Sequence, residues 1–168
     1  MTKLELKTYH RVAEKIKEQV QVWNNLTELY QDYVHLVCRD VITESTETGG
    51  FKNGERKSIQ LSHPAHSDNC SLKPDGTCVK KEPAYTWRDF SAVLYLNNDF
   101  TGGNTFFADG TGRKVQAEVE GKVGRLLGFC ASEKCIHGVM PLKSGKRCGL
   151  LQWFSQDYRE AYYITFAN

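Results

Sequence analysis

The first thirty residues place apolar side chains at steps of three and four positions, which is the spacing of one face of an α-helix. This stripe consists of Tyr9, Val12, Ile16, Val20, Trp23, Leu26 and Tyr30. Lysine and glutamate residues occupy much of the remaining surface, and no Gly or Pro interrupts the run. The pattern predicts a helix that packs on the outside of a sheet.

After Tyr33 the spacing changes to short apolar runs separated by turns that contain Gly or Pro. Residues 33–39 and 91–98 are typical of buried strands, and in residues 115–119 the alternation of Val115, Ala117 and Val119 predicts one buried face. Eight or nine strands without intervening helices favour an all-β barrel or jelly roll. We therefore divide the chain into a helical segment, 1–32, and a β domain, 33–168.

Composition and charge narrow the function classes. The chain has 168 residues, enough for one domain with its own core, and a net charge of +2. So small a charge does not favour nucleic acid or an anionic membrane as the main partner. No apolar run approaches the length of a membrane span, so any anchor is expected outside this chain.

Six cysteines form two pairs that are close in sequence, Cys70 with Cys78 and Cys130 with Cys135, and leave Cys38 and Cys148. An even number and close spacing favour disulfides in an oxidising compartment, and we predict a Cys70–Cys78 bond. Free buried thiols are the alternative. A zinc site is disfavoured because no C-x₂-C pair exists.

His66 and Asp68 lie two positions apart, so on a regular strand an imidazole and a carboxylate would point to the same side. Together they supply two members of the 2-His-1-carboxylate set that holds non-haem Fe(II) and leaves coordination positions open. The third ligand should be a histidine from another strand. His137, at the start of a late apolar run, is the candidate.

The other three histidines fit the ligand set less well. His10 belongs to the predicted helix, and His35 lies in an early strand as a core or surface residue. His63 is three positions before His66, which puts it on the opposite face of a regular strand.

Arg147 follows His137 by ten residues and opens the last apolar strand. A guanidinium drawn into an apolar interior needs an anion, and its planar fork matches a carboxylate. An iron site with a nearby arginine suggests a dicarboxylic cosubstrate such as 2-oxoglutarate. The alternative is a surface residue in a Gly-Lys-Arg turn.

The sequence resembles the prolyl-hydroxylase-type Fe(II)/2-oxoglutarate dioxygenases from about residue 33 to residue 158. The resemblance is carried by the order of His66, Asp68, His137 and Arg147 and by the motifs "HLVCR", "LSHPAHSDNC", "KEPAYTWRDFSAVLYLN", "HGV" and "GKRC-x₄-WF". It is strongest to the leprecan prolyl 3-hydroxylases and, among them, to the small branch of the 2-oxoglutarate and iron-dependent oxygenase domain-containing protein 3.

This resemblance implies a double-stranded β-helix, a jelly roll, with His66, Asp68 and His137 as iron ligands. It implies that Arg147 binds the distal carboxylate of 2-oxoglutarate. Tyr95 would add a hydrogen bond to the same carboxylate, although an ordinary core aromatic is the alternative.

Two features depart from the leprecan pattern. The segment "FCASEKCIHG" carries two cysteines where leprecans are expected to have a Ser/Gly-rich loop, and the chain ends without an endoplasmic-reticulum retention tetrapeptide. The resemblance still implies the endoplasmic reticulum or the secretory pathway, with a membrane anchor outside this chain.

The resulting hypothesis is a dioxygenase that uses Fe(II), 2-oxoglutarate and O₂, with ascorbate as a further cofactor, and releases succinate and CO₂. Its partner would be a protein or peptide in which it hydroxylates a prolyl-like residue. One alternative is a catalytically silent jelly-roll binding module that retains the metal site. Another is a zinc site that supports hydrolysis.

Overall fold

The computed structural model describes residues 2–41, 50–52, 55–57 and 61–161. The helical elements are α1 (Lys3–Trp23), η1 (Glu133–Cys135) and η2 (Tyr158–Glu160). The strands are β1 (Tyr30–Asp40), β2 (Gly50–Lys52), β3 (Glu55–Lys57), β4 (His63–His66), β5 (Ser71–Leu72), β6 (Cys78–Val79), β7 (Phe90–Tyr95), β8 (Phe100–Gly102), β9 (Thr105–Ala108), β10 (Val115–Val119), β11 (Leu126–Cys130), β12 (His137–Val139) and β13 (Leu142–Ser155).

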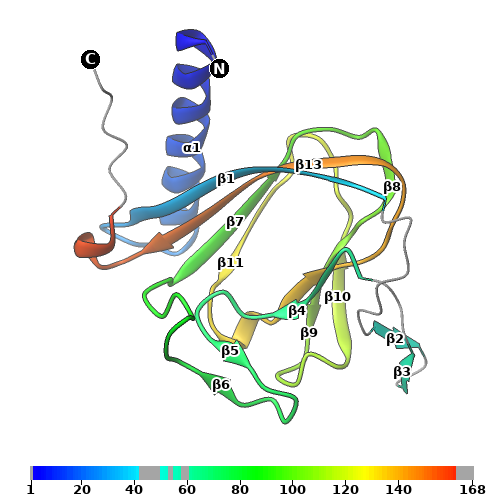
Figure 1. Ribbon diagram of the computed structural model, residues 1–168. Helices are drawn as coiled ribbons and strands as arrows, with labels where there is room; N and C mark the ends of the chain where they lie inside the picture. The colour runs from blue at the N-terminus through cyan, green and yellow to red at the C-terminus, as the bar shows by residue number, and fades with distance from the viewer. Residues whose placement is uncertain (1, 42–49, 53–54, 58–60, 162–168) are drawn as a thin grey trace.

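Two antiparallel sheets form the body of the protein (Figure 1). The larger has the order β1-β13-β7-β11, with β8 also paired to β13, and the smaller has the order β10-β9-β12-β4. Neighbours in both sheets come from distant parts of the chain, which is typical of a jelly roll. The predicted fold class is confirmed.

Helix α1 packs on the outside of the larger sheet (Figure 1), as its apolar stripe predicts. Its first turn is fixed by a capping box in which Thr2 accepts from the Glu5 amide and Glu5 accepts from the Thr2 amide. The helix ends at Trp23, earlier than the stripe indicates, and Leu26 packs on the same core from the following loop. No described helix combines the length and hydropathy needed to cross a membrane.

Strand β13 separates this core from the interior of the sandwich, because its side chains alternate between the two faces. Leu150 and Phe154 face the helix and are 3% and 0% exposed. Between them the fully buried Gln152 donates to the Ala13 carbonyl at 3.0 Å and to the Gln31 side chain at 2.8 Å. These bonds attach the helix to the sheet and add a side-chain link between β13 and β1 within it.

All six cysteines are paired, as Cys38–Cys148, Cys70–Cys78 and Cys130–Cys135. The predicted Cys70–Cys78 disulfide is confirmed, and it closes the β5–β6 hairpin. Cys38 and Cys148 are directly opposite on β1 and β13, so their bond follows the register of the larger sheet.

The predicted alternation in residues 115–119 is wrong in one detail. Val115 packs against the core of the smaller sheet, but Ala117 is exposed. The pairing of β10 with β9 shifts its register between these two residues, and such an irregularity turns the following side chains to the other face.

We predict that Val20→Ala lowers the free energy of unfolding by about 2 kcal/mol, because Val20 is fully buried under the larger sheet. Val22→Ala is the matched control, since Val22 lies on the same helix and is 73% exposed. Denaturant unfolding of both variants checks this. Equal loss of stability in the two variants would contradict the packing described here.

Candidate functional site

His66, Asp68 and His137 come together at one point in the interior of the sandwich. Each offers one ligand atom, and these atoms all lie within 4.8 Å of one another. The Nε2 atom of His66 lies 3.5 Å from Asp68 Oδ1, and the Nε2 atom of His137 lies 3.5 Å from Asp68 Oδ2. The structure therefore brings together the three residues selected from the sequence.

The two histidines are placed by the smaller sheet. His66 ends β4, His137 begins β12, and the two are directly opposite in the antiparallel pairing of these strands. Their rings lie 4.3 Å apart between centroids. The sequence predicted that His66 and Asp68 share one face of a strand. In the structure β4 ends at His66, and Asp68 lies in the turn that follows.

Hydrogen bonds fix which nitrogen of each imidazole faces the centre. His66 Nδ1 lies 2.9 Å from the Pro64 carbonyl, and His137 Nδ1 lies 3.0 Å from the Cys135 carbonyl. A carbonyl only accepts, so each Nδ1 donates and each neutral ring turns the lone pair of Nε2 to Asp68. The Ser91 hydroxyl donates to Asp68 Oδ2 at 2.6 Å and orients the carboxylate.

The electrostatics of the three groups are coupled. Burial opposes ionisation of Asp68, but His66, which donates to the carboxylate from Nε2 when its ring is protonated, and the nearby His137 outweigh burial and lower the pKa of the carboxyl. Burial lowers the pKa of His137 to about 4, with His66 adding to the effect. For His66, burial is outweighed by Asp68, and the pKa is raised.

This arrangement fits a divalent metal ion. Two imidazole lone pairs and an ionised carboxylate that converge on one point repel each other. A positive charge at the centre, either a proton on His66 or a metal ion, removes that repulsion. Two neutral imidazoles and one carboxylate are the ligand set of non-haem Fe(II).

A cavity of about 190 Å³ opens beside the three residues. Arg147 lines it from β13 and is only 6% exposed. Its Nη2 atom donates to Thr105 Oγ1 at 3.4 Å, and its guanidinium lies 4.8 Å from the centroid of the Tyr95 ring. The Nε atom of Arg147 is buried without a hydrogen-bond partner, which is costly unless an anion binds there.

Tyr95 is fully buried next to Arg147. Its hydroxyl lies 2.7 Å from Thr105 Oγ1, the same atom that accepts from Arg147. Tyr95 is not among the described residues that line the cavity, so it lies behind Thr105 and Arg147. In this position Tyr95 supports the Arg147 guanidinium. A direct hydrogen bond from Tyr95 to a ligand stays a prediction.

Several cavity residues were not identified from the sequence. His63 lies on the same side as His66, with ring centroids 4.3 Å apart, and not on the opposite face. The reason is a register shift in the pairing of β4 with β12, where His66 and His63 oppose His137 and Val139. His35 also lines the cavity from β1, where its side chain is exposed.

Trp153 forms another part of the wall and is held by a buried arginine. The Arg88 guanidinium lies 4.5 Å from the Trp153 ring centroid and 3.9 Å from that of Tyr85. Its charge is balanced by Asp32, which accepts from Arg88 Nε at 2.7 Å. Asp32 also accepts from the Trp87 indole at 3.1 Å, so the loop before β7 is attached to β1.

A known protein family matches the part of the chain that contains the candidate metal ligands. The model of the 2OG-Fe(II) oxygenase superfamily matches residues 58–155, which include His66, Asp68, His137 and Arg147. Prolyl 3-hydroxylase 1 of Rattus norvegicus is 43% identical over 91% of this chain and 20% of that protein. Prolyl 3-hydroxylase 2 of Homo sapiens is 37% identical over 90% of this chain and 21% of that protein. The chain thus spans about a fifth of these curated relatives.

Among solved structures, the fold is similar to that of a viral collagen prolyl hydroxylase from Paramecium Bursaria Chlorella virus-1 in a 2OG complex. The TM-score is 0.53 at 18% identity, over 92% of this chain and 75% of that chain. At this identity the likeness concerns the fold alone.

We predict that His66→Ala weakens Co(II) binding at least about 100-fold, because it removes one of three ligands. His63→Ala is the matched control, since it removes an imidazole from the same strand that is not part of the ligand set. Isothermal titration of Co(II) into both variants measures the difference. Equal loss in the two variants would mean that His66 is not a ligand.

Proposed function

Because the chain belongs to the 2OG-Fe(II) oxygenase superfamily, we propose that it is an Fe(II)- and 2-oxoglutarate-dependent dioxygenase that hydroxylates a prolyl-like residue of a protein or peptide. One observation carries the proposal: a set of two imidazoles and a carboxylate shares a cavity with a buried arginine that has an unpaired Nε. A metal site for hydrolysis needs no such anion partner.

In this proposal, iron with 2-oxoglutarate and O₂ supplies the oxidation of a C–H bond to an alcohol, with succinate and CO₂ as the other products. His66, Asp68 and His137 would hold the iron through Nε2, a carboxylate oxygen and Nε2. Their hydrogen bonds to Pro64, Ser91 and Cys135 keep the three groups oriented before the metal binds.

Arg147 would bind the distal carboxylate of the cosubstrate. Its Nη2 is already occupied by Thr105, and its guanidinium is flanked by the Tyr95 ring, so the side chain is held in place before the ligand arrives. Gly103 leaves room for it, since a Cβ there would lie 3.1 Å from Arg147 Cδ. A preorganised cation loses less entropy on binding.

The prolyl-like acceptor is supported by two observations. The curated relatives are prolyl 3-hydroxylases by name, at 36% to 43% identity. In addition, apolar and aromatic side chains, among them Phe129 and Trp153, line the cavity next to the metal centre. Such walls suit an apolar ring better than a charged side chain.

The compartment is also part of the proposal. Three disulfides among the described residues support folding in an oxidising environment such as the secretory pathway. Ascorbate as a further cofactor and a membrane anchor outside this chain rest on the resemblance alone.

We predict that Asp68→Ala abolishes consumption of 2-oxoglutarate, because the site loses its only carboxylate ligand among the described residues. Asp75→Ala is the control, since Asp75 lies in an exposed turn. Succinate release with a proline-rich peptide measures the effect, and peptide binding is followed in parallel. Retained turnover in Asp68→Ala would refute the proposed dioxygenase, and absence of turnover in the unchanged protein would favour a binding module.

We predict that Arg147→Ala raises the dissociation constant for 2-oxoglutarate at least about 30-fold, because a buried charge pair is lost, at a cost of roughly 2 kcal/mol or more. The metal affinity should change little, since Arg147 is not a ligand. Anaerobic titration of the Fe(II)-loaded protein, followed by visible spectroscopy, measures both. Arg113→Ala, in an exposed loop, is the control. Equal affinity in Arg147→Ala and the unchanged protein would remove the assigned role.

A further inference from the structure

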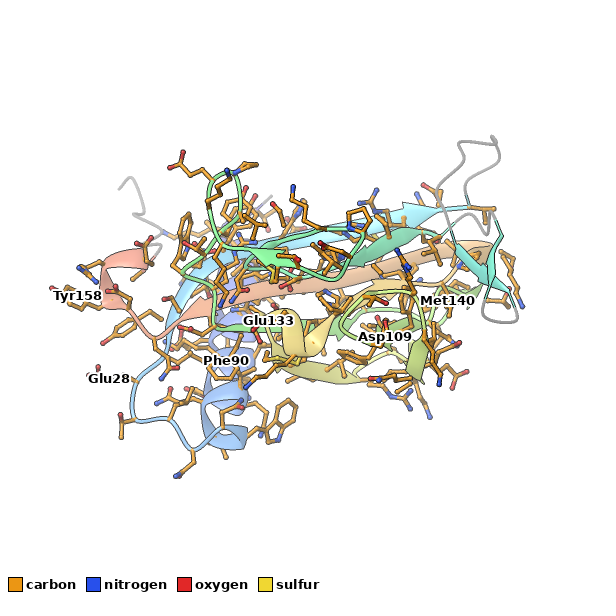
Figure 2. The ribbon with its side chains drawn as sticks, turned by 90° about the horizontal axis from the view of Figure 1, so that it is seen from below. Glu28, Phe90, Asp109, Glu133, Met140 and Tyr158 are labelled. Atoms are coloured by element: carbon orange, nitrogen blue, oxygen red, sulfur yellow. A yellow bond between two sulfur atoms is a disulfide. The ribbon has the colours of Figure 1, made fainter. Side chains whose placement is uncertain are left out.

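The loop between β11 and β12 closes on itself through the Cys130–Cys135 disulfide. It contains the single turn η1, and Figure 2 looks onto this end of the molecule, where Glu133 marks the turn. These two cysteines distinguish the segment from the expected leprecan pattern. The proposed reaction assigns them no role.

The first link between this loop and the metal centre is the carbonyl of Ala131. It accepts from the amides of Asp68 and Asn69, each at 3.1 Å, and from the Ser67 hydroxyl at 2.8 Å. Ala131 is only 1% exposed, so water does not compete effectively for these donors. Asp68 lies beyond the end of β4 and has no partner strand there among the described residues. The Ala131 carbonyl accepts the hydrogen bond from the Asp68 amide in place of such a partner.

The second link is the carbonyl of Cys135. It accepts from His137 Nδ1 at 3.0 Å and so sets both the tautomer and the rotation of that ring. One short loop therefore orients two of the three ligands, which come from different parts of the chain.

Contacts from outside the loop hold its two ends, since the Ala131 amide donates to the Asp89 carbonyl at 2.9 Å and Glu133 pairs with Lys80 at 3.8 Å. Within it, the Cys135 amide donates to the Ser132 carbonyl at 2.9 Å, which makes one turn of 3₁₀ helix. An isolated turn of this kind is marginal, because one hydrogen bond has to offset the entropy of several residues. Closing the six-residue ring with a disulfide removes most of that freedom.

We propose that the Cys130–Cys135 disulfide is a positioning element that keeps the carbonyls of Ala131 and Cys135 in place and, through them, Asp68 and His137 in their metal-binding arrangement. This inference rests on the metal site of the proposed function. A dithiol reductant opens the ring: the S–S bond breaks, two electrons and two protons give two thiols, and the reductant becomes a disulfide. The affinity of the site for metal then falls.

The test uses the double variant Cys130→Ser/Cys135→Ser in the full chain, with two readouts. Hydrogen exchange of the Asp68 and Asn69 amides, measured without added metal, is expected to be at least about 10-fold faster, since their acceptor is no longer held. Binding of Co(II), measured by titration, is expected to weaken about 10- to 100-fold. Far-UV circular dichroism and exchange in β7 establish that the variant remains folded.

Two controls separate positioning from general destabilisation. Lys134→Ala changes an exposed side chain of the same loop and leaves the ring closed. Cys38→Ser/Cys148→Ser removes a disulfide between β1 and β13. This disulfide lies in the larger sheet and is not part of the loop that carries the Ala131 and Cys135 carbonyls. Neither control should alter the two readouts under conditions in which it is folded.

Unchanged exchange and unchanged Co(II) affinity in Cys130→Ser/Cys135→Ser would overturn the inference. So would equal effects of all three variants. If the unchanged, oxidised protein binds no Co(II), the proposed function fails, and the exchange comparison alone decides whether the ring positions Asp68.

Discussion

Three electron-rich groups repel one another at the centre of the site, and the fold has to hold them together against this repulsion. His66 and His137 each commit the Nδ1 proton to a backbone carbonyl, so both Nε2 atoms turn to a carboxylate whose pKa is lowered. Such an arrangement is stable only with positive charge at its centre. The surrounding strands and loops supply the rigidity that keeps the three groups from moving apart, and this is the condition for holding a metal ion with open coordination positions.

Much of the fold could be predicted from hydrophobic spacing. The stripe that includes Ile16 and Val20 predicts a helix on a sheet, and these residues are buried there. Spacing did not predict where the helix ends, because Leu26 continues the periodicity but packs on the core from a loop. It also did not predict that Ala117 is exposed, because a register shift leaves no mark in local composition.

The chemistry of the site could be read from residue types, but its geometry could not. His66, Asp68, His137 and Arg147 share one cavity, as expected. Asp68, however, reaches it from a turn held by the distant Ala131 carbonyl, and His63 reaches it through an irregular pairing with β12. Both effects depend on contacts between segments far apart in sequence. Pairwise spacing such as His-x-Asp carries no information on them.

The disulfides connect the fold to the site. Cys70 follows Asp68 by two residues, Cys135 precedes His137 by two, and Cys148 is next to Arg147. Each crosslink therefore lies beside a residue that the proposed reaction uses. Near Asp68 the crosslink joins the residue before β5 to β6 of a two-stranded hairpin, and near His137 it joins the end of β11 to a single helical turn, so ladder hydrogen bonds are few on at least one side of each bond. A covalent constraint is most effective in such short elements, because hydrogen bonds alone leave them marginal. An oxidising compartment would then be a requirement for the geometry of the metal centre as well as for the stability of the domain.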